Sequence, residues 1–341
     1  MKPTIYDIAR ATDVSIATVS KVLNNTGRIG AVTRQRVLQA MSEMGYERNT
    51  LATALAGKNM YSIGLLLPDV NNPYFSGVVR GAEDAAFHRN YSLLICNTDN
   101  NQEKEQVYIK TLRAKRVDGI IIATGMTEPS TIKDLIEDGI EVVLLSRSIP
   151  DVHVPLITVD NFLGGYVAAT HLLELGHREI AVLTEPLYIR SAKNRLEGFK
   201  QALHEAPFEC SYTVYEGEGF GMSTGAKLTS QLLKEEPVTA VFAGTDQMAV
   251  GAMQVCREAG KTVPDDISIL GFDDTSWARI VDPPLSTVAQ PMYLLGQLAT
   301  DRIIHRIEVG DRRHDPLVLT PRLVVRGSTK APRALRAGEW L

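Results

Sequence analysis

The stretch TIYDIARATDVSIATVSKVLN, residues 4–24, reads as two short helices joined by a tight turn. Thr4 is a suitable N-cap for the first helix, and Asp7 can reach back to it as the acidic partner of a capping box. Asp13 stands where the chain must turn sharply, and aspartate tolerates left-handed backbone geometry better than most residues. Ser15 can cap the second helix. This pattern predicts a helix-turn-helix.

The two helices divide their side chains between a shared core and an outer surface. Apolar residues at helical spacing can pack between them: Ile5, Ile8, Ala9, Val14, Val19 and Val22. Other residues near the start of the second helix are left outside: Ile16, Ala17, Thr18, Ser20 and Lys21. Such positions meet base edges when a helix of this kind enters the major groove of DNA. The alternative is an ordinary amphipathic hairpin with its polar face in water.

A third helix completes this head, residues 1–47. We expect it to begin at Thr33 as N-cap and to run to about Met44, with Gly45 as its C-terminal stop. Its apolar stripe is expected to comprise Val37, Leu38, Met41 and Met44.

Charge is distributed unevenly along the 341 residues. The whole chain has a net charge of −4, with 36 basic and 40 acidic residues. Residues 1–60 hold eight basic and four acidic residues, a net charge of +4, so the remainder carries −8. A basic head on an acidic body is the pattern expected when only one end of a protein contacts phosphates.

The three cysteines, Cys96, Cys210 and Cys256, are widely spaced and include no CxxC pair. They indicate neither a disulfide framework nor a zinc site, and we expect buried free thiols in a reducing cytoplasm. The N-terminus lacks the apolar segment of a signal peptide, and no apolar run approaches the ~18 residues of a membrane helix. We therefore expect a cytoplasmic protein with no membrane partner.

A short helix is also expected in the segment NTLATALAG, residues 49–57. Helices of about two turns are marginal alone, so this one should order only against a partner. Leu51 and Leu55 share one face and could pack on a second copy of the protein, or Leu55 could also wedge between base steps in the minor groove. A flexible linker is the alternative reading of residues 48–60.

From residue 61 the chain alternates between strands and helices. Eight stretches rich in Val, Ile and Leu read as buried strands, at residues 62–70, 91–99, 117–125, 141–148, 178–186, 211–218, 238–246 and 266–274. Helical stretches lie between or after them, at residues 75–89, 102–116, 162–175, 190–205, 222–235, 247–259 and 291–309. Gly176 and Gly260 fit left-handed C-caps, and LVLT and RLVVR can add edge strands. Two such series predict an α/β core of two lobes, each a doubly wound parallel sheet.

The sequence shows no motif that indicates an enzyme. The Gly-rich segment GEGFGMSTG, residues 217–225, lacks GxGxxG spacing, and no acidic residue ends a strand about 20 residues further on. The seven histidines show no metal-ligand spacing and no catalytic triad is evident, so we expect no cofactor and no metal. A periplasmic solute-binding protein would share the two lobes but not the head, and a nonspecific architectural DNA binder would not need such a core.

Eight phrases in collinear order, from residue 2 to about residue 327, resemble the lactose-repressor/galactose-repressor (LacI/GalR) family. They are TIYDIARATDVSIATVSKVLN, NTLATALAG, SIGLLLPDVNNPYF, AKRVDGIII, LGHREIAVL, TDQMAVGA, VPDDISILGFDDT and STVAQP. The resemblance implies a homodimeric transcription regulator that acts as a repressor, with a core of the periplasmic-binding-protein type. It implies three crossovers between the lobes, with residues 61–160 plus 291–320 in one and residues 161–290 plus 321–330 in the other. The tail, residues 331–341, lacks the heptads of a tetramerising coiled coil.

On this likeness, Ile16, Ala17 and Lys21 would read bases and Arg28 would lie at the groove edge. Phosphates of a pseudo-palindromic operator would be held by Tyr6, Thr18, Ser20, Asn24 and Thr33, and Leu55 would occupy the intercalating position. Arg48 and Thr53 depart from the residues that many family hinges carry at these positions. Phosphate contacts fix register, whereas base contacts supply sequence preference.

The resemblance also implies a small-molecule effector, a sugar or sugar derivative, bound between the lobes. Its expected contacts are Tyr74, Phe75, Ser146, Arg147, Ser191, Arg195, Phe220, Thr245 and Asp273. Aromatic faces and strong hydrogen bonds from arginine and aspartate suit such a ligand. Each has a structural alternative: Phe75 and Phe220 could be core, Arg195 could pair with a carboxylate on a surface helix, and Asp273 could cap a turn.

Overall fold

The computed structural model describes residues 3–23, 27–46, 60–125, 127–235 and 237–332, which form two compact units, Met1–Met60 and Tyr61–Leu341. The expected hinge helix with Leu55, Arg48 and Thr53 lies outside the described residues, as do Asn24 and most of the expected tail.

The first unit contains α1 (Ile5–Thr12), α2 (Ile16–Leu23) and α3 (Ala31–Glu43). Its core centres on three fully buried side chains, those of Ile8, Val19 and Val37. The cap and turn expectations are confirmed. The Asp7 carboxylate accepts from the Thr4 backbone N–H at 2.9 Å, Asp13 has a φ of 50°, and Ser15 Oγ accepts from the Thr18 N–H at 3.1 Å.

The third helix differs from the prediction at its start and along its stripe. It begins at Ala31 with Gly30 as N-cap, so Thr33 lies inside its first turn rather than capping it. Val37 is buried and Met41 packs against the core, but Leu38 and Met44 are exposed. Only a narrow stripe of the third helix contacts the two shorter helices. Apolar residues on either side of this stripe therefore remain exposed to solvent. Gly45 is in the left-handed region, as expected of a C-terminal stop.

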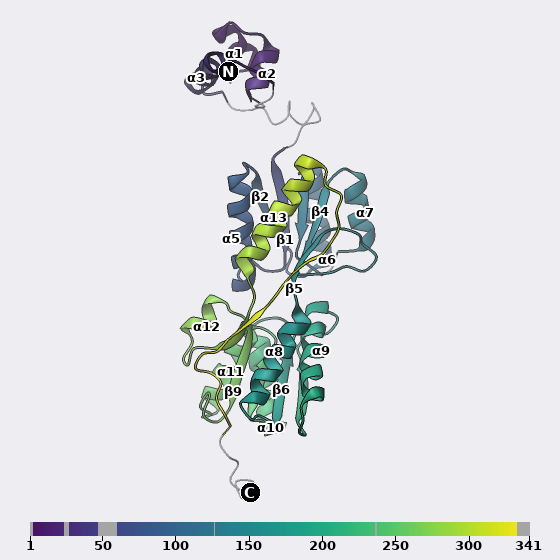
Figure 1. Cartoon of the computed structure of the whole chain (residues 1–341), viewed down its shortest axis with the longest axis vertical. Helices are drawn as coiled ribbons and strands as arrows, with labels where there is room; N and C mark the ends of the chain where they lie inside the picture. The colour runs from purple at the N-terminus through teal and green to yellow at the C-terminus, as the bar shows by residue number, and fades with distance from the viewer. Residues whose placement is uncertain (1–2, 24–26, 47–59, 126, 236, 333–341) are drawn as a thin grey trace, which may run out of the picture. The chain divides into compact units, whose positions relative to one another are not determined.

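Lobe 1 of the second unit is built on one six-stranded sheet (Figure 1). Its strands, in spatial order, are β11 (Leu317–Leu319), β5 (Leu156–Val159), β4 (Glu141–Leu145), β3 (Gly119–Ile122), β1 (Ser62–Leu67) and β2 (Ser92–Asn97). One face packs against α5 (Pro73–His88) and α13 (Met292–Val309). The other packs against α6 (Gln102–Ala114) and α7 (Pro129–Glu137).

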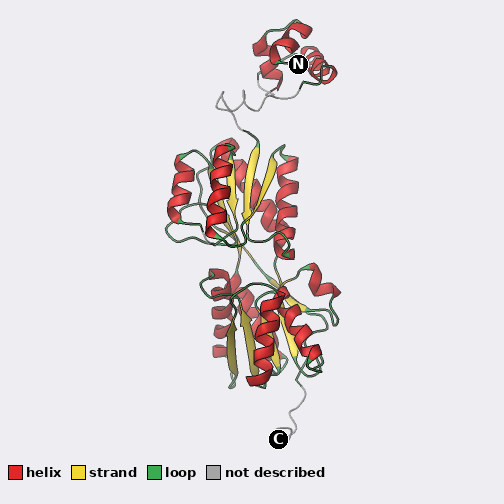
Figure 2. Cartoon of the chain, turned by 180° about the vertical axis from the view of Figure 1, so that it is seen from behind, coloured by secondary structure: helices red, strands yellow, loops and turns green. Residues whose placement is uncertain are grey.

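Lobe 2 repeats this arrangement on a second six-stranded sheet. Its strands, in spatial order, are β12 (Arg322–Val324), β10 (Ser286–Ala289), β9 (Ser268–Asp273), β8 (Ala240–Ala243), β6 (Glu179–Thr184) and β7 (Ser211–Glu216). One face packs against α8 (Asn161–Glu174) and α9 (Arg190–Glu205). The other packs against α10 (Met222–Glu235), α11 (Asp246–Glu258) and α12 (Ser276–Ile280). Helices thus flank both faces of each sheet (Figure 2).

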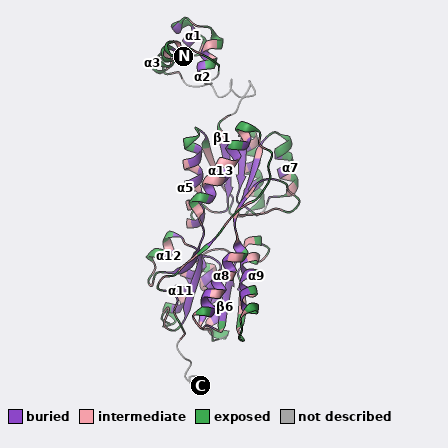
Figure 3. Cartoon of the chain, in the orientation of Figure 1, coloured by how far each residue is buried: buried purple, intermediate pink, exposed green. Residues whose placement is uncertain are grey.

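The strands pair in parallel throughout both sheets, except that β12 runs antiparallel to β10. The central strands are buried along nearly their whole length, whereas the outer helix faces are exposed (Figure 3). Burial on both faces explains their near-continuous Val, Ile and Leu content. The predicted α/β class and the two parallel sheets are confirmed.

The chain passes between the two sheets at three places. It leaves lobe 1 after β5, returns after β10 and crosses again between β11 and β12. Residues Asn161 and Gln290 stand at the first two crossovers. The sequence analysis did not identify β5, β10, α7 or α12, which are short elements of four, four, nine and five residues.

Glycine allows neighbouring helices in each lobe to approach closely. A Cβ on Gly81 of α5 would lie 1.9 Å from the Tyr293 carbonyl oxygen of α13. A Cβ on Gly165 of α8 would lie 1.8 Å from the Arg195 carbonyl oxygen of α9. No larger residue fits these contacts without displacing backbone, so the two lobes use the same packing device.

The cysteines, membrane spans and metal sites were also the subject of expectations from the sequence. Cys96 and Cys256 are buried free thiols whose pKa values burial raises to about 11, but Cys210 is only partly buried. Across the described part of the chain, no helix is long and apolar enough to cross a membrane. The same residues contain no group of three or more His, Cys, Asp or Glu that could hold a metal ion.

Candidate functional site

The outer side of the helix-turn-helix presents several of the expected DNA-contacting residues. Ile16, at the first position of α2, is 41% exposed, although its side chain is large and apolar. Tyr6 on α1 is 63% exposed, and Ala17, Lys21 and Arg28 are also exposed. Thr18, Ser20 and Thr33 are partly buried. An exposed isoleucine at a helix start is available for apolar contact with a partner, which is consistent with the predicted role.

A cleft lies between the two lobes of the core, with about 440 Å³ of atom-free space including its mouth. Residues that follow β4 in lobe 1 and β6, β8 and β9 in lobe 2 line it, together with the first turns of α5 and α9. Its lining consists of Asn72, Tyr74, Phe75, Ser146, Arg147, Asn161, Glu185, Ser191, Arg195, Thr245, Asp273 and Gln290. Ligands in open α/β sheets bind at such strand ends.

The lobe 1 wall is aromatic and lightly hydrogen-bonded. The Tyr74 and Phe75 rings meet edge to face with their centroids 5.0 Å apart. The Tyr74 hydroxyl and the Ser146 hydroxyl form a hydrogen bond of 2.6 Å, and Asn72 Oδ1 accepts from the Tyr74 backbone N–H at 3.0 Å. Burial raises the pKa of Tyr74 to about 12, so its hydroxyl stays protonated at neutral pH.

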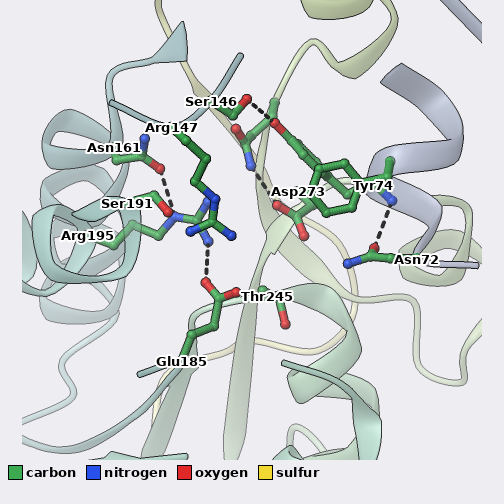
Figure 4. Close-up of a pocket in the computed structure, with 12 residues that line it drawn as sticks. Asn72, Tyr74, Ser146, Arg147, Asn161, Glu185, Ser191, Arg195, Thr245 and Asp273 are labelled. Atoms are coloured by element: carbon green, nitrogen blue, oxygen red, sulfur yellow. Dashed lines mark hydrogen bonds and ion pairs between the residues drawn. The ribbon is translucent and has the colours of Figure 1, made fainter. Parts of the chain in front are cut away.

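The lobe 2 wall is organised by Arg195 (Figure 4). Its Nε donates to Asn161 Oδ1 at 2.9 Å and its Nη1 donates to the Gly244 carbonyl at 2.5 Å. Nη1 also lies 3.6 Å from Glu185 Oε2, and the guanidinium carbon lies 3.9 Å from the Phe272 ring centroid. Arg195 and Glu185 are both buried. These contacts hold Nε, Nη1 and one face of the guanidinium group in place.

Asp273 stands at the end of β9 in a conformation that side chains rarely adopt, with a φ of 127°. Its Oδ1 accepts a 2.6 Å hydrogen bond from Gln290 Nε2. Burial raises the pKa of Asp273 well above its ordinary value, against the lowering effect of Arg195. Strained backbone at a cleft is typical of functional positions, where the surrounding structure holds it in place. Asp273 lines the cleft, where its carboxyl group is hydrogen-bonded to Gln290.

A second buried carboxyl group, that of Asp246, lies close enough to Asp273 to help raise its pKa. Asp246, the first residue of α11, accepts hydrogen bonds from the Thr275 N–H at 2.7 Å, from its hydroxyl at 2.9 Å and from the Thr287 hydroxyl at 2.6 Å. Burial raises the pKa of Asp246 to about 6. Thr245 caps the same helix, where its hydroxyl accepts from the Met248 N–H at 3.2 Å. Thr245 therefore has a structural role as well as a place in the cleft.

The structure brings eight of the nine expected effector contacts into this one cleft. The exception is Phe220, which lines an adjoining outer cavity of about 740 Å³ of atom-free space together with Asp69 and Gln247. Asn72, Phe75, Arg147 and Glu185 line both spaces. The alternative in which Arg195 pairs with a carboxylate on a surface helix is wrong, because its carboxylate partner Glu185 lines the cleft. Whether the lining residues bind a ligand stays a prediction.

Four lining residues were missed by the sequence analysis: Asn72, Asn161, Glu185 and Gln290. Asn72 had a local signal, because an asparagine before Pro73 is a good N-cap at the end of a strand-loop segment. Glu185 follows β6 in the same way that Asp273 ends β9. Asn161 and Gln290 belong to the crossovers, and only the three-dimensional arrangement of the lobes places them at the cleft.

Comparison with known families matches both units of the chain. Residues 4–49 match the model described as "Bacterial regulatory proteins, lacI family". Residues 169–329 match the model described as "Periplasmic binding protein-like domain". The first match covers the helix-turn-helix, and the second lies in the core that contains the cleft.

Individual proteins match along nearly the whole chain. The HTH-type transcriptional regulator DegA of Bacillus subtilis strain 168 is 40% identical over 333 residues, which cover 96% of this chain and 98% of that relative. The crystal structure of the lac repressor dimer bound to operator and the anti-inducer ONPF has a TM-score of 0.84 at 31% identity, covering 97% of this chain and 100% of that one. A transcriptional regulator from Enterococcus faecium with bound ribose has a TM-score of 0.73 at 33% identity, covering 80% and 100%.

Proposed function

This chain belongs to the LacI family of DNA-binding transcriptional repressors, and we propose that a small molecule bound in its interlobe cleft controls its affinity for operator DNA. The observation that carries the proposal is the cleft itself, whose lining comes from both lobes and combines aromatic faces with buried polar groups. The relatives it matches are transcriptional regulators rather than enzymes.

On the DNA side, we infer that two copies of the chain form a homodimer whose heads bind a pseudo-palindromic operator. The lac repressor dimer bound to operator supports this inference, because it shares the fold of the whole chain. Ile16, Ala17 and Lys21 would contact bases. Tyr6, Thr18, Ser20 and Thr33 would hold phosphates, and Arg28 would lie at the edge of the groove. Lys21 supplies the hydrogen-bonded part of base recognition, since Ile16 and Ala17 offer only apolar contacts.

On the ligand side, we infer a small polyhydroxylated molecule such as a sugar or sugar derivative. Tyr74 and Phe75 provide apolar faces, while Arg195 and Asp273 provide oriented hydrogen-bonding groups. Ribose in the Enterococcus faecium neighbour supports this class of ligand. A molecule that contacts both walls favours one relative angle of the lobes, and it shifts DNA affinity only by its differential affinity for the two angles.

The test is selection of bound sequences from a random DNA pool by the full-length protein, repeated with a panel of sugars, sugar acids, sugar phosphates and nucleobases. We expect an enriched palindrome whose binding responds to one compound, and the direction of the response distinguishes induction from co-repression. Failure of every compound to alter DNA binding or to raise the thermal unfolding midpoint would count against the proposal.

A further inference from the structure

Arg147 differs from Arg195 in having no hydrogen-bond or ion-pair partner among the residues that the structure describes. It follows β4, directly after Ser146, and Figure 4 shows its guanidinium group pointing into the cleft beside that of Arg195. Arg195 is held by Asn161, Gly244 and Glu185. Across the described ranges, the structure gives the Arg147 side chain no hydrogen bond and no ion pair. Its donors are therefore available to whatever fills the cleft.

The cleft holds more positive than negative charge around Arg147. Two guanidinium groups face two carboxyl groups, but Glu185 forms its ion pair with Arg195. Asp273 is hydrogen-bonded by Gln290, and burial raises its pKa well above the ordinary value, which favours its uncharged form. Burial also lowers the pKa of Arg147, yet a guanidinium group keeps its proton far above neutral pH. Glu185 also acts electrostatically on Arg147, so the two guanidinium groups share one carboxylate charge and one positive charge is left over.

Helix ends add to this positive potential. Asn72 and Thr245 are the N-caps of α5 and α11, and Ser191 lies in the first turn of α9. All three residues line the cleft. The N-terminus of a helix carries a partial positive charge and favours a nearby anion. The three helix ends therefore act in the same direction as Arg147.

We propose that the cleft takes a polyhydroxylated molecule with a single anionic group, a carboxylate or a phosphate, and that this group pairs with Arg147. The proposal rests on the proposed function, because it names the class of ligand for the same cleft. Asp69 and Asp99 line the outer cavity, so electrostatic repulsion directs the anionic group to the inner side of Arg147. The hydroxyl groups then face Arg195 and Asp273.

The test compares matched ligands by calorimetry on the full-length protein: glucose, glucuronate and glucose 6-phosphate; galactose and galacturonate; ribose and ribose 5-phosphate. We expect one anionic compound to bind at least about tenfold more tightly than its neutral counterpart, the equivalent of one charge-assisted hydrogen bond. The carboxylate and phosphate arms identify which anion the cleft takes.

Three variants assign the preference to Arg147. Arg147→Gln should remove the preference for the anion and Arg147→Lys should keep part of it. Both should fold, because Arg147 has no hydrogen bond or ion pair to lose among the described residues. Arg190→Gln is the matched control, since Arg190 is exposed in the first turn of α9 and does not line the cleft. It should bind as the wild type does.

The outcomes separate this inference from the proposed function. If a neutral sugar binds as tightly as its anionic counterparts and alters operator binding, the inference is wrong and the proposed function stands. The inference also fails if Arg147→Gln keeps the full preference for the anion. If no compound of either charge binds or changes operator affinity, the proposed function fails and this inference fails with it.

Discussion

Lobe 1 and lobe 2 are built on the same plan, but they present differently ordered walls to the cleft. Each has a six-stranded sheet and a helix pair packed through glycine, at Gly81 in lobe 1 and Gly165 in lobe 2. In lobe 2, Arg195 is bonded to three other groups and Asp273 is held by Gln290. In lobe 1, Arg147 is unpaired among the described residues.

This difference suggests that the two lobes make different contributions to ligand binding. A wall whose side chains are already fixed loses little conformational entropy when a ligand binds, whereas a free arginine must be ordered at that moment. Lobe 2 should therefore supply most of the intrinsic affinity. Lobe 1 should add contacts as the lobes change their relative angle, which links occupancy of the cleft to a conformational change.

The largest effect is expected from breaking the lobe 2 wall. Arg195→Met should weaken ligand binding by about 100-fold, the equivalent of two charge-assisted hydrogen bonds at ~1.5 kcal/mol each. It should also destabilise the core by about 3 kcal/mol, because it leaves the buried Glu185 without its ion pair. Calorimetry and urea unfolding measure the two effects. Arg190→Met is the control on the same helix, and unchanged ligand affinity in Arg195→Met would refute the assigned role.

A pair of glycine substitutions compares the lobes directly. Gly165→Ala forces a Cβ against the Arg195 backbone, whereas Gly81→Ala forces one against Tyr293 on α13, a helix that supplies no cleft residue. Overpacking should cost each variant about 2 kcal/mol of unfolding free energy. Only Gly165→Ala should also lose about tenfold in ligand affinity, because it displaces Arg195. Equal ligand losses in both variants would show that the lobes contribute alike.

The fold of the core was largely predictable from the sequence. Its long buried strands carry continuous runs of Val, Ile and Leu, whereas the apolar residues of an amphipathic helix recur only every three or four positions. The short strand β10, in contrast, contains the buried residues Ser286 and Thr287, whose hydrogen-bond partners are Ser328 in the C-terminal segment and Asp246 on α11. Local sequence cannot reveal such partners, since they lie more than 40 residues away. The start of α3 was misplaced because Thr33 is a good N-cap residue, whereas the structure uses Gly30.

The cleft was predictable in part, through residues that end strands or begin helices and through the family resemblance. Arg195 and Asp273 were identified in this way, but Glu185, their neighbour, was not. The difference between the walls was not predictable, because it depends on which groups satisfy each guanidinium. The partners of each guanidinium group are known only from interatomic distances in the structure, such as the 3.6 Å between Arg195 Nη1 and Glu185 Oε2.

The smallest expected effect concerns a hydrogen-bonded residue of lobe 2 that lies outside the cleft. It tests whether the fixed hydrogen bonds of lobe 2 extend beyond the cleft wall. His177 bonds Thr239 Oγ1 at 2.9 Å and the Lys330 carbonyl oxygen at 3.0 Å, which ties the C-terminal segment to the sheet. Burial lowers the pKa of His177 to about 4, below the ~6.5 of an unfolded histidine. The neutral ring's contribution to stability is therefore complete above about pH 6.5 and is lost as the pH falls toward 4.

His177→Asn should cost about 1 kcal/mol at pH 7.5 through its weaker hydrogen bonds. It should also lose less stability than the wild type between pH 6.5 and 4, with ligand affinity unchanged. Urea unfolding across this pH range measures both. His204→Asn, at an exposed position on α9, should follow the wild-type profile. A wild-type pH dependence in His177→Asn would contradict the account of this residue.

Reciprocal linkage tests the control of DNA binding most directly. The affinity of the full-length protein for its selected palindrome would be measured with and without the ligand, and the affinity for the ligand with and without the palindrome. Since coupling between two sites is mutual, the ligand should change the Kd for DNA by the same factor as DNA changes the Kd for the ligand. A ligand that binds the cleft while leaving the Kd for DNA unchanged would contradict the proposed control of operator binding.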